Sequence, residues 1–90
     1  MTAFRQDYPD HLRVLLKDIG ARLRHLRRRR GLTQKQVAAR VPMHIAQYRH
    51  LEQGRSDVLV STLQRVAAGL NVPAWTLLRK PRRSPASRPA

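Results

Sequence analysis

The sequence contains no cysteine, one tryptophan, one phenylalanine and two tyrosines among its 90 residues. Without cysteine, neither a disulfide framework nor a zinc site with thiolate ligands can hold the chain together. The longest charge-free apolar stretch, residues 66–78, is interrupted by Gly69, Asn71 and Pro73 and is too short to cross a bilayer. The first 17 residues do not resemble a secretion signal. We therefore expect a small, soluble cytoplasmic domain that folds by apolar packing and does not span a membrane.

The sequence also lacks the residue sets on which catalysis and metal binding depend. No Ser/His/Asp set, no pair of carboxylates and no phosphate-binding glycine loop can be assembled. The four histidines, at positions 11, 25, 44 and 50, share no ligand spacing and have no carboxylate or thiolate ligands with them. We therefore predict no enzyme activity, no metal and no cofactor.

Positive charge is what the sequence has in excess. Nineteen Lys and Arg against five Asp and Glu give a net charge of +14. A field of this sign attracts polyanions, chiefly nucleic acid or an anionic membrane surface. The alternative is a solvated surface in an organism whose coding favours arginine. Composition alone does not choose between these interpretations.

The composition divides the chain into three zones. Residues 1–18 form an N-terminal extension, residues 19–78 a periodic apolar segment, and residues 79–90 a tail of Arg, Lys, Pro, Ser and Ala. The tail has no large apolar residue, so we predict that it is disordered and adds salt-sensitive attraction to phosphates. In the extension, Leu12, Leu15 and Leu16 have helical spacing that continues into residue 19. A partly helical extension and one long helix over residues 11–30 both fit.

A first helix is predicted over residues 19–30. Ile19, Leu23 and Leu26 recur at helical spacing, Asp18 precedes them as an N-cap, and Gly31 follows as a left-handed stop.

The second helix has a strong start signal in the stretch LTQKQV. Thr33 and Gln36 make a capping-box pair, and Leu32 and Val37 occupy the positions of a hydrophobic staple. The helix must end near Pro42, because proline cannot donate a backbone hydrogen bond and disfavours the helical conformation in the residue before it.

The third helix is predicted in the stretch HIAQYRHLEQG, after a turn of about three or four residues. Tyr48 and Leu51, with Met43 just ahead, are expected to point to the core. The positions expected to face away from the core are Ile45, Ala46, Arg49 and His50. Two short helices joined by such a turn in a basic protein describe a helix-turn-helix.

Two further helices complete the predicted bundle. One contains the apolar stripe from Leu59 to Leu70 and is capped by either Asp57 or Ser61. The other is the stretch VPAWTLL, with Pro73 in its first turn. Five helices and no strands make an all-α fold.

Three segments, IGARLRHLRRRRGLTQKQVA, YRHLEQGR and TLQRVAAGLNV, resemble the Cro/repressor (XRE-type) helix-turn-helix family over residues 19–78. The resemblance implies a five-helix, lambda-repressor-like DNA-binding domain. Its second helix would lie across the DNA backbone, and the helix near residues 44–52 would enter the major groove. The implied base-reading positions are Ile45, Ala46 and His50, with His44, Gln47 and Arg49 beside them. The implied phosphate contacts are Thr33, Gln34, Arg27, Gln53, Arg55 and Ser56.

The chemistry of the third helix agrees with base reading. The stretch VPMHIAQY carries no formal charge, and long cations there would bind phosphates without distinguishing bases. Ile45 and Ala46 suit thymine methyl groups, whereas Gln47, Arg49 or His50 could bond purine edges, each bidentate pair discriminating by roughly 1–3 kcal/mol. The alternative for Ile45 is inward packing in a shifted helix.

Two positions test the resemblance. The family usually has glycine with positive φ where this chain has Pro42, so the turn must follow another path or Pro42 must begin an earlier helix. Glu52 is the only glutamate, and by resemblance it pairs with Arg27 as an internal bridge between the third and first helices. The alternative is an exposed pair worth at most about 1 kcal/mol.

The predicted function is a sequence-specific regulator, specifically a repressor, that binds double-stranded DNA in the nucleoid and has no membrane partner. An antitoxin that binds a toxin protein and represses its own operon is the alternative, and coating of nucleic acid through charge alone is a third. Family members often dimerise on half-sites about 34 Å apart. The extension with Trp75, Leu77 and Leu78 offers a self-association surface for a homodimer. The alternative is packing of Phe4, Tyr8 and Leu12 against Trp75 within one chain.

Overall fold

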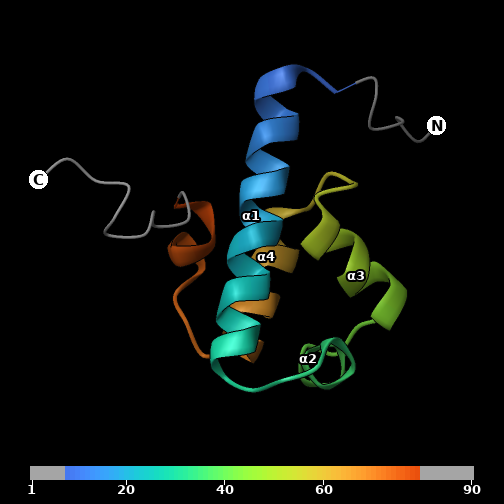
Figure 1. The fold of residues 1–90 in the computed structure, drawn as a ribbon, viewed down its shortest axis with the longest axis vertical. Helices are drawn as coiled ribbons and strands as arrows, with labels where there is room; N and C mark the ends of the chain where they lie inside the picture. The colour runs from blue at the N-terminus through green and yellow to red at the C-terminus, as the bar shows by residue number, and fades with distance from the viewer. Residues whose placement is uncertain (1–7, 80–90) are drawn as a thin grey trace, which may run out of the picture.

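The computed structural model describes residues 8–79, which form four α-helices followed by one 3-10 helix and contain no strand. The elements are α1 (Asp10–Arg29), α2 (Gln34–Arg40), α3 (Ile45–Gln53), α4 (Val60–Gly69) and η2 (Ala74–Leu78). In Figure 1, α1 is a central rod with α3 on one side, η2 on the other and α4 behind it. The all-α prediction is confirmed, with the fifth helix a 3-10 helix. Residues 80–90 of the predicted tail lie outside the described residues.

Helix α1 is one continuous helix of 20 residues that starts after Pro9. The predicted N-cap at Asp18 is therefore wrong, and the long-helix alternative is the one the structure has. The reason is that the apolar stripe continues without a break from Leu16 to Leu26, and all its members are buried. Helix α1 thus passes through residue 18, where composition placed a boundary; the division into extension and domain stays a prediction.

Gly20 lies inside α1 without interrupting it, and its lack of a side chain allows α3 to approach closely. A Cβ atom at this position would lie 2.7 Å from the carbonyl oxygen of Leu51 and 2.7 Å from the carbonyl carbon of Glu52. Real Cβ atoms do not approach backbone atoms this closely. The glycine therefore fixes where the two helices cross.

The apolar core draws on all five elements. Each fully buried large side chain stabilises the fold by about 1.5–3 kcal/mol. The buried apolar residues of the central cluster are Ile19, Leu23, Leu26, Val37, Ala38, Val41, Tyr48, Leu51, Leu63, Val66, Ala67, Leu70 and Leu77. None of the helices within residues 8–79 is long and apolar enough to span a membrane.

The capping signals were correct at α2 and wrong at α4. Thr33 Oγ1 accepts a hydrogen bond from the Gln36 amide, and Gln36 Oε1 accepts one from the Thr33 amide, which confirms the capping box. Gly31 has a φ of 66°, as the left-handed stop requires. Neither Asp57 nor Ser61 caps α4: the Asp57 carboxylate accepts from the adjacent Val58 amide, 2.8 Å away, and Ser61 lies inside the first turn.

The turn between α2 and α3 differs from the glycine turn expected of the family. The Val41–Pro42 peptide bond is cis, and the Met43 amide donates to the Ala38 carbonyl oxygen at 2.8 Å. Helix α3 begins at Ile45, after His44. Pro42 is therefore part of the turn and does not begin an earlier helix.

Candidate nucleic-acid interface

Helix α3 has one buried face and one exposed face. Tyr48, Leu51 and Glu52 are buried against the rest of the molecule. The exposed residues are His44 at its start, then Ala46, Gln47, Arg49, His50 and Gln53. The structure therefore brings five of the six predicted base-reading residues together on one accessible surface.

Ile45 does not face away from the core as the helical spacing predicted. It is partly buried and packs against the central cluster. Ile45, Tyr48 and Glu52 are separated by three and four residues, so they lie on the same face of α3. Inward packing, the alternative considered for Ile45, is therefore the better description.

A buried ion pair fixes α3 against α1. Arg27 donates from Nε to Glu52 Oε2 at 2.6 Å and from Nη2 to Glu52 Oε1 at 3.1 Å. The Glu52 side chain is 1% exposed and that of Arg27 is 12% exposed, so this is the predicted internal bridge and not a surface pair. Arg27 Nη1 also donates to the carbonyl oxygen of Leu32 at 3.0 Å. The Arg27 guanidinium is thus largely committed to internal bonds, and its predicted phosphate contact stays a prediction.

The surroundings of Glu52 keep its carboxylate ionised. Burial alone would raise the pKa of Glu52, but the hydrogen bonds from Arg27 and Gln34 outweigh burial and lower that pKa below its ordinary value of 4.5. The hydrogen bond to Glu52 likewise raises the pKa of Arg27. Arg24 Nε lies 3.8 Å from Glu52 Oε1 and adds positive charge at the same carboxylate. Glu52 is therefore charged at neutral pH.

The buried Tyr48 side chain stands beside this ion pair. Its hydroxyl has no hydrogen-bond partner within residues 8–79, and burial raises the pKa of Tyr48 well above its ordinary range. The phenol therefore stays neutral and acts as a core side chain.

Gln34 links the ion pair to the exposed face of α3, which sequence reasoning missed. Its Nε2 donates to Glu52 Oε1 at 3.0 Å, and its Oε1 accepts from Arg49 Nε at 3.3 Å. The three residues come from α2 and α3, and no sequence spacing signals a contact that depends on how two helices pack. The predicted phosphate contact of Gln34 stays a prediction.

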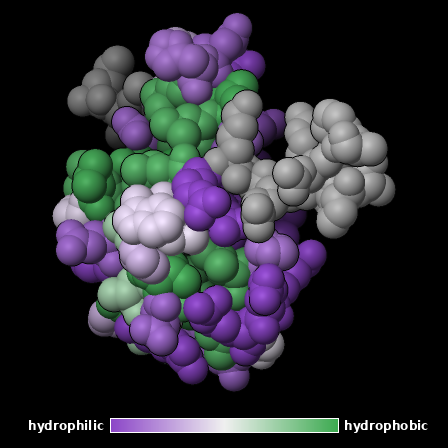
Figure 2. Space-filling model, turned by 90° about the vertical axis from the view of Figure 1, so that its left-hand side faces the viewer, coloured by the Kyte–Doolittle hydropathy of each residue, from purple (hydrophilic) through white to green (hydrophobic). Residues whose placement is uncertain are grey.

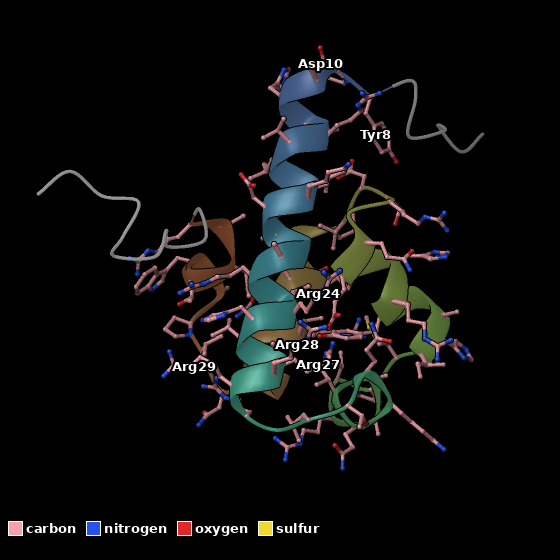
Figure 3. The ribbon with its side chains drawn as sticks, viewed as in Figure 1. Tyr8, Asp10, Arg24, Arg27, Arg28 and Arg29 are labelled. Carbon is pink, nitrogen blue, oxygen red and sulfur yellow. The ribbon has the colours of Figure 1, made fainter. Side chains whose placement is uncertain are left out.

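The other predicted phosphate contacts lie at the two ends of the helix pair. Thr33 is exposed at the start of α2, Gln53 and Arg55 are exposed at and after the end of α3, and Ser56 is half-buried. Sequence reasoning missed what holds this last segment: the Asp57 amide donates to the hydroxyl of Tyr8 at 3.1 Å. Figure 3 shows Tyr8 next to the start of α1, on the side of the α3–α4 loop.

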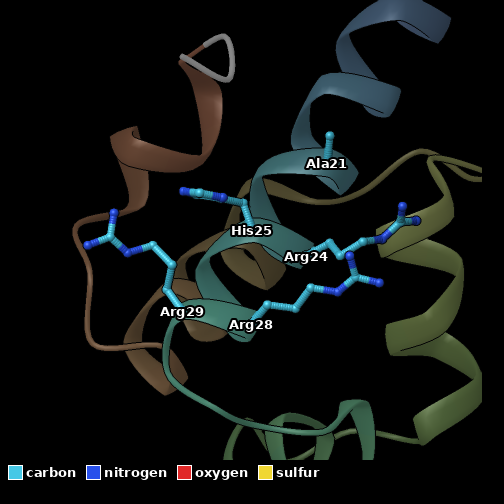
Figure 4. A pocket seen from close by; sticks show the side chains of 5 residues that line it. All are labelled: Ala21, Arg24, His25, Arg28 and Arg29. Carbon is cyan, nitrogen blue, oxygen red and sulfur yellow. The ribbon is translucent and has the colours of Figure 1, made fainter. Parts of the chain in front are cut away.

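The outer face of α1 adds a stripe of cations beside this surface. Ala21, Arg24, His25, Arg28 and Arg29 line an open hollow on the helix. Figure 4 shows that Arg24 and Arg28 extend toward α3, whereas His25 and Arg29 extend toward η2. Two cations of α1, Arg24 and Arg28, therefore extend toward the helix whose outer face is exposed.

The family described as "Helix-turn-helix domain" matches residues 18–79. The chain belongs to the helix-turn-helix family. The match includes α2 and α3, and the resemblance to the Cro/repressor (XRE) type is confirmed. Helix-turn-helix domains of this type are DNA-binding regulators of transcription.

Solved structures of similar helix-turn-helix proteins agree with this family. The restriction-modification controller protein C.AhdI from Aeromonas hydrophila is 27% identical with a TM-score of 0.67, covering 69% of this chain and 94% of its own. The clp gene regulator ClgR from C. glutamicum is 28% identical with a TM-score of 0.68, and the match covers 71% of this chain and 82% of ClgR. The hypothetical transcription factor NHTF from Neisseria is 23% identical with a TM-score of 0.72, and the match covers 90% of this chain and 85% of NHTF. At this identity the likeness shows the fold alone. No curated protein matches this sequence.

The assignment of residues to base edges or phosphates stays a prediction, as do the cytoplasmic location and the absence of enzyme activity and cofactors.

Proposed function

We propose that this helix-turn-helix protein is a sequence-specific transcriptional repressor that reads the major groove of double-stranded DNA with the exposed face of α3. The observation that supports this most directly is the division of α3. Its inner face is locked to α1 by the buried Arg27–Glu52 pair, and its outer face presents Ala46, Gln47, Arg49 and His50 to solvent. Base discrimination requires directional side chains in fixed positions, and this arrangement supplies both.

Phosphate contacts would supply most of the affinity. Thr33 and Gln34 lie at the start of α2, and Gln53, Arg55 and Ser56 lie at and after the end of α3, so the two sets are at opposite ends of the helix pair. Contacts of this kind fix the register of the protein on the duplex but carry no base information. Repression requires only that the bound protein occupy the duplex, so it needs no surface beyond these.

Selection of duplexes from a random pool, followed by competition against random DNA at several salt concentrations, tests the proposal. We expect the selected duplex to bind about 10³-fold or more tightly than random DNA. Gln47→Ala should relax the preference at one base pair. Arg55→Ala should instead weaken all duplexes alike and reduce the salt slope by about one. Equal affinity for selected and random DNA at every salt concentration would show coating by charge alone.

We further propose that the protein binds as a homodimer through an apolar face away from α3. The large apolar residues exposed in the described chain are Val14, Leu15, Leu59, Val60, Trp75 and Leu78, from α1, η2 and the start of α4. Leu77, which the sequence analysis assigned to the self-association surface, is fully buried in the core and is not part of this face. Figure 2 looks at the molecule from the η2 side and shows apolar side chains gathered in patches on this face. Because η2 and α3 flank α1 on opposite sides, a second copy on this face would leave both copies of α3 free. Co-purification of a different protein bound to this face would instead favour the antitoxin alternative.

A further inference from the structure

The side-chain amide of Gln34 is held in one orientation by chemistry. The Glu52 carboxylate can only accept hydrogen bonds, so the Gln34 group that faces it at 3.0 Å must be the Nε2 amide. The Gln34 carbonyl oxygen then points the other way and accepts from Arg49 Nε at 3.3 Å. The position of the Gln34 oxygen is therefore set by the Glu52 carboxylate, which is itself buried.

Glu52 is itself held by hydrogen bonds from Arg27. Both of its oxygens accept from the Arg27 guanidinium, and its side chain is 1% exposed. A chain of hydrogen bonds therefore runs from α1 through α3 and α2 to the exposed side chain of Arg49. Long exposed arginines normally lose considerable rotamer freedom when they bind, and a fixed acceptor at Nε reduces that loss in advance.

The atoms that Arg49 keeps available define what it can recognise. With Nε directed to Gln34, the N–H groups of Nη1 and Nη2 remain as a planar pair of parallel donors on the exposed face of α3. In the major groove, guanine presents two acceptors, O6 and N7, that match such a pair, whereas adenine presents one acceptor and one donor. The arrangement therefore favours guanine over the other bases.

We propose, building on the DNA-reading function above, that Arg49 reads a guanine through Nη1 and Nη2 and that Gln34 is its positioning residue. Gln34 then determines specificity at one base pair in addition to any contact with a phosphate. Lysine at position 49 would retain the charge but could not make the paired contact.

The test measures binding of the wild-type protein and four variants to the selected duplex and to duplexes with each base pair replaced in turn. The variants are Arg49→Ala, Arg49→Lys, Gln34→Ala and the double variant Gln34→Ala/Arg49→Ala. The control is Arg13→Ala, which removes one exposed cation near the start of α1. Thermal unfolding of each variant establishes that it is folded before its binding is compared.

We expect the wild-type protein to prefer guanine at one position by roughly 5- to 150-fold. Arg49→Lys and Gln34→Ala should both lose most of that preference at the same position, and the double variant should lose no more than Arg49→Ala alone. Arg13→Ala should weaken all duplexes by a similar factor and keep the preference.

Two results would overturn the inference while leaving the DNA-reading function intact. If Gln34→Ala weakens every duplex by one common factor and retains the guanine preference, Gln34 is a phosphate ligand only. If Arg49→Ala changes no base preference, Arg49 does not read a base. A wild-type protein without any preferred duplex would contradict the proposed function itself, and this outcome is visible before any variant is made.

Discussion

The corner around Glu52 and the side of the molecule at η2 are built with opposite chemistry. At the corner, α1, α2 and α3 are joined by hydrogen bonds among Arg27, Glu52 and Gln34 in addition to apolar contacts. On the η2 side, Leu70 and Leu77 are fully buried among apolar neighbours, and apolar side chains such as Trp75 remain exposed. The first region is suited to hold directional groups in place, and the second to bury apolar area against a partner.

This difference teaches how a small domain separates two tasks. Apolar contacts stabilise a fold without specifying direction, whereas a bidentate ion pair specifies both distance and orientation. Substitutions at the corner should therefore alter stability and DNA reading together. Substitutions on the exposed η2 side should alter self-association and leave the folded monomer intact.

The largest expected effect is that of Glu52→Ala at the corner. Removing the carboxylate leaves Arg27 buried without its partner, which should lower the free energy of unfolding by about 3–5 kcal/mol and also weaken DNA binding. Chemical denaturation and duplex titration measure the two effects. Glu52→Gln, which keeps one acceptor, should be affected less. A Glu52→Ala variant with unchanged stability would contradict the assigned role of the ion pair.

Acid should weaken the same corner selectively. Because the pKa of Glu52 is lower in the folded protein than its ordinary 4.5, the ion pair contributes fully above that pH. The contribution is lost as the pH falls through the lower, folded-state pKa. Denaturation curves between neutral pH and acid should therefore show a steeper loss of stability below pH 4.5 for the wild type than for Glu52→Gln. Parallel curves for the two proteins would show that Glu52 is not the titrating group.

Two glycines with the same backbone conformation allow the stability cost of a positive φ to be separated from the cost of close packing. Gly31 and Gly54 have φ values of 66° and 65°. A Cβ at Gly54 would lie 2.8 Å from the Lys17 Cα, whereas none of the described atoms beyond the adjacent residues lies within 4 Å at Gly31. Gly31→Ala should cost about 1 kcal/mol and Gly54→Ala about 1–3 kcal/mol more, measured by thermal unfolding. Equal costs would mean that the loop after α3 does not depend on its contact with α1.

The smallest effect on stability is expected on the η2 side. Trp75 and Leu78 are 58% and 52% exposed, so replacing them by Ala and Ser should change the free energy of unfolding of the monomer by about 0.5 kcal/mol or less. Sedimentation should nevertheless show a weaker dimer, because the substitutions remove apolar area from the proposed contact. Arg49→Ala serves as the control that leaves self-association unchanged. An unaltered dimer would place the contact elsewhere.

Much of the fold could be predicted from the sequence because its signals are local. The Thr33 capping box, the left-handed Gly31 and the inward positions of Tyr48 and Leu51 each depend on residues within a few positions of one another, and all were confirmed. The errors had two sources: one local signal that outweighed another, and one contact between residues far apart in the sequence. The N-cap at Asp18 failed because the apolar stripe of α1 extends past it, and Ile45 turned inward because the core was available to it.

The sequence by itself determined an all-helical, strongly basic protein with a helix-turn-helix, since periodicity, caps and charge are written along the chain. The family resemblance pointed to Arg27 as the partner of Glu52, but the helical pattern itself does not single out one of the four consecutive arginines at 27–30. The tertiary structure decided that Arg27 is the one whose side chain is largely enclosed, and that Gln34 joins Glu52 to Arg49. Those four side chains are chemically identical, and only their direction around α1 separates them. Where each helix packs sets that direction, and the packing depends on residues far away in the sequence.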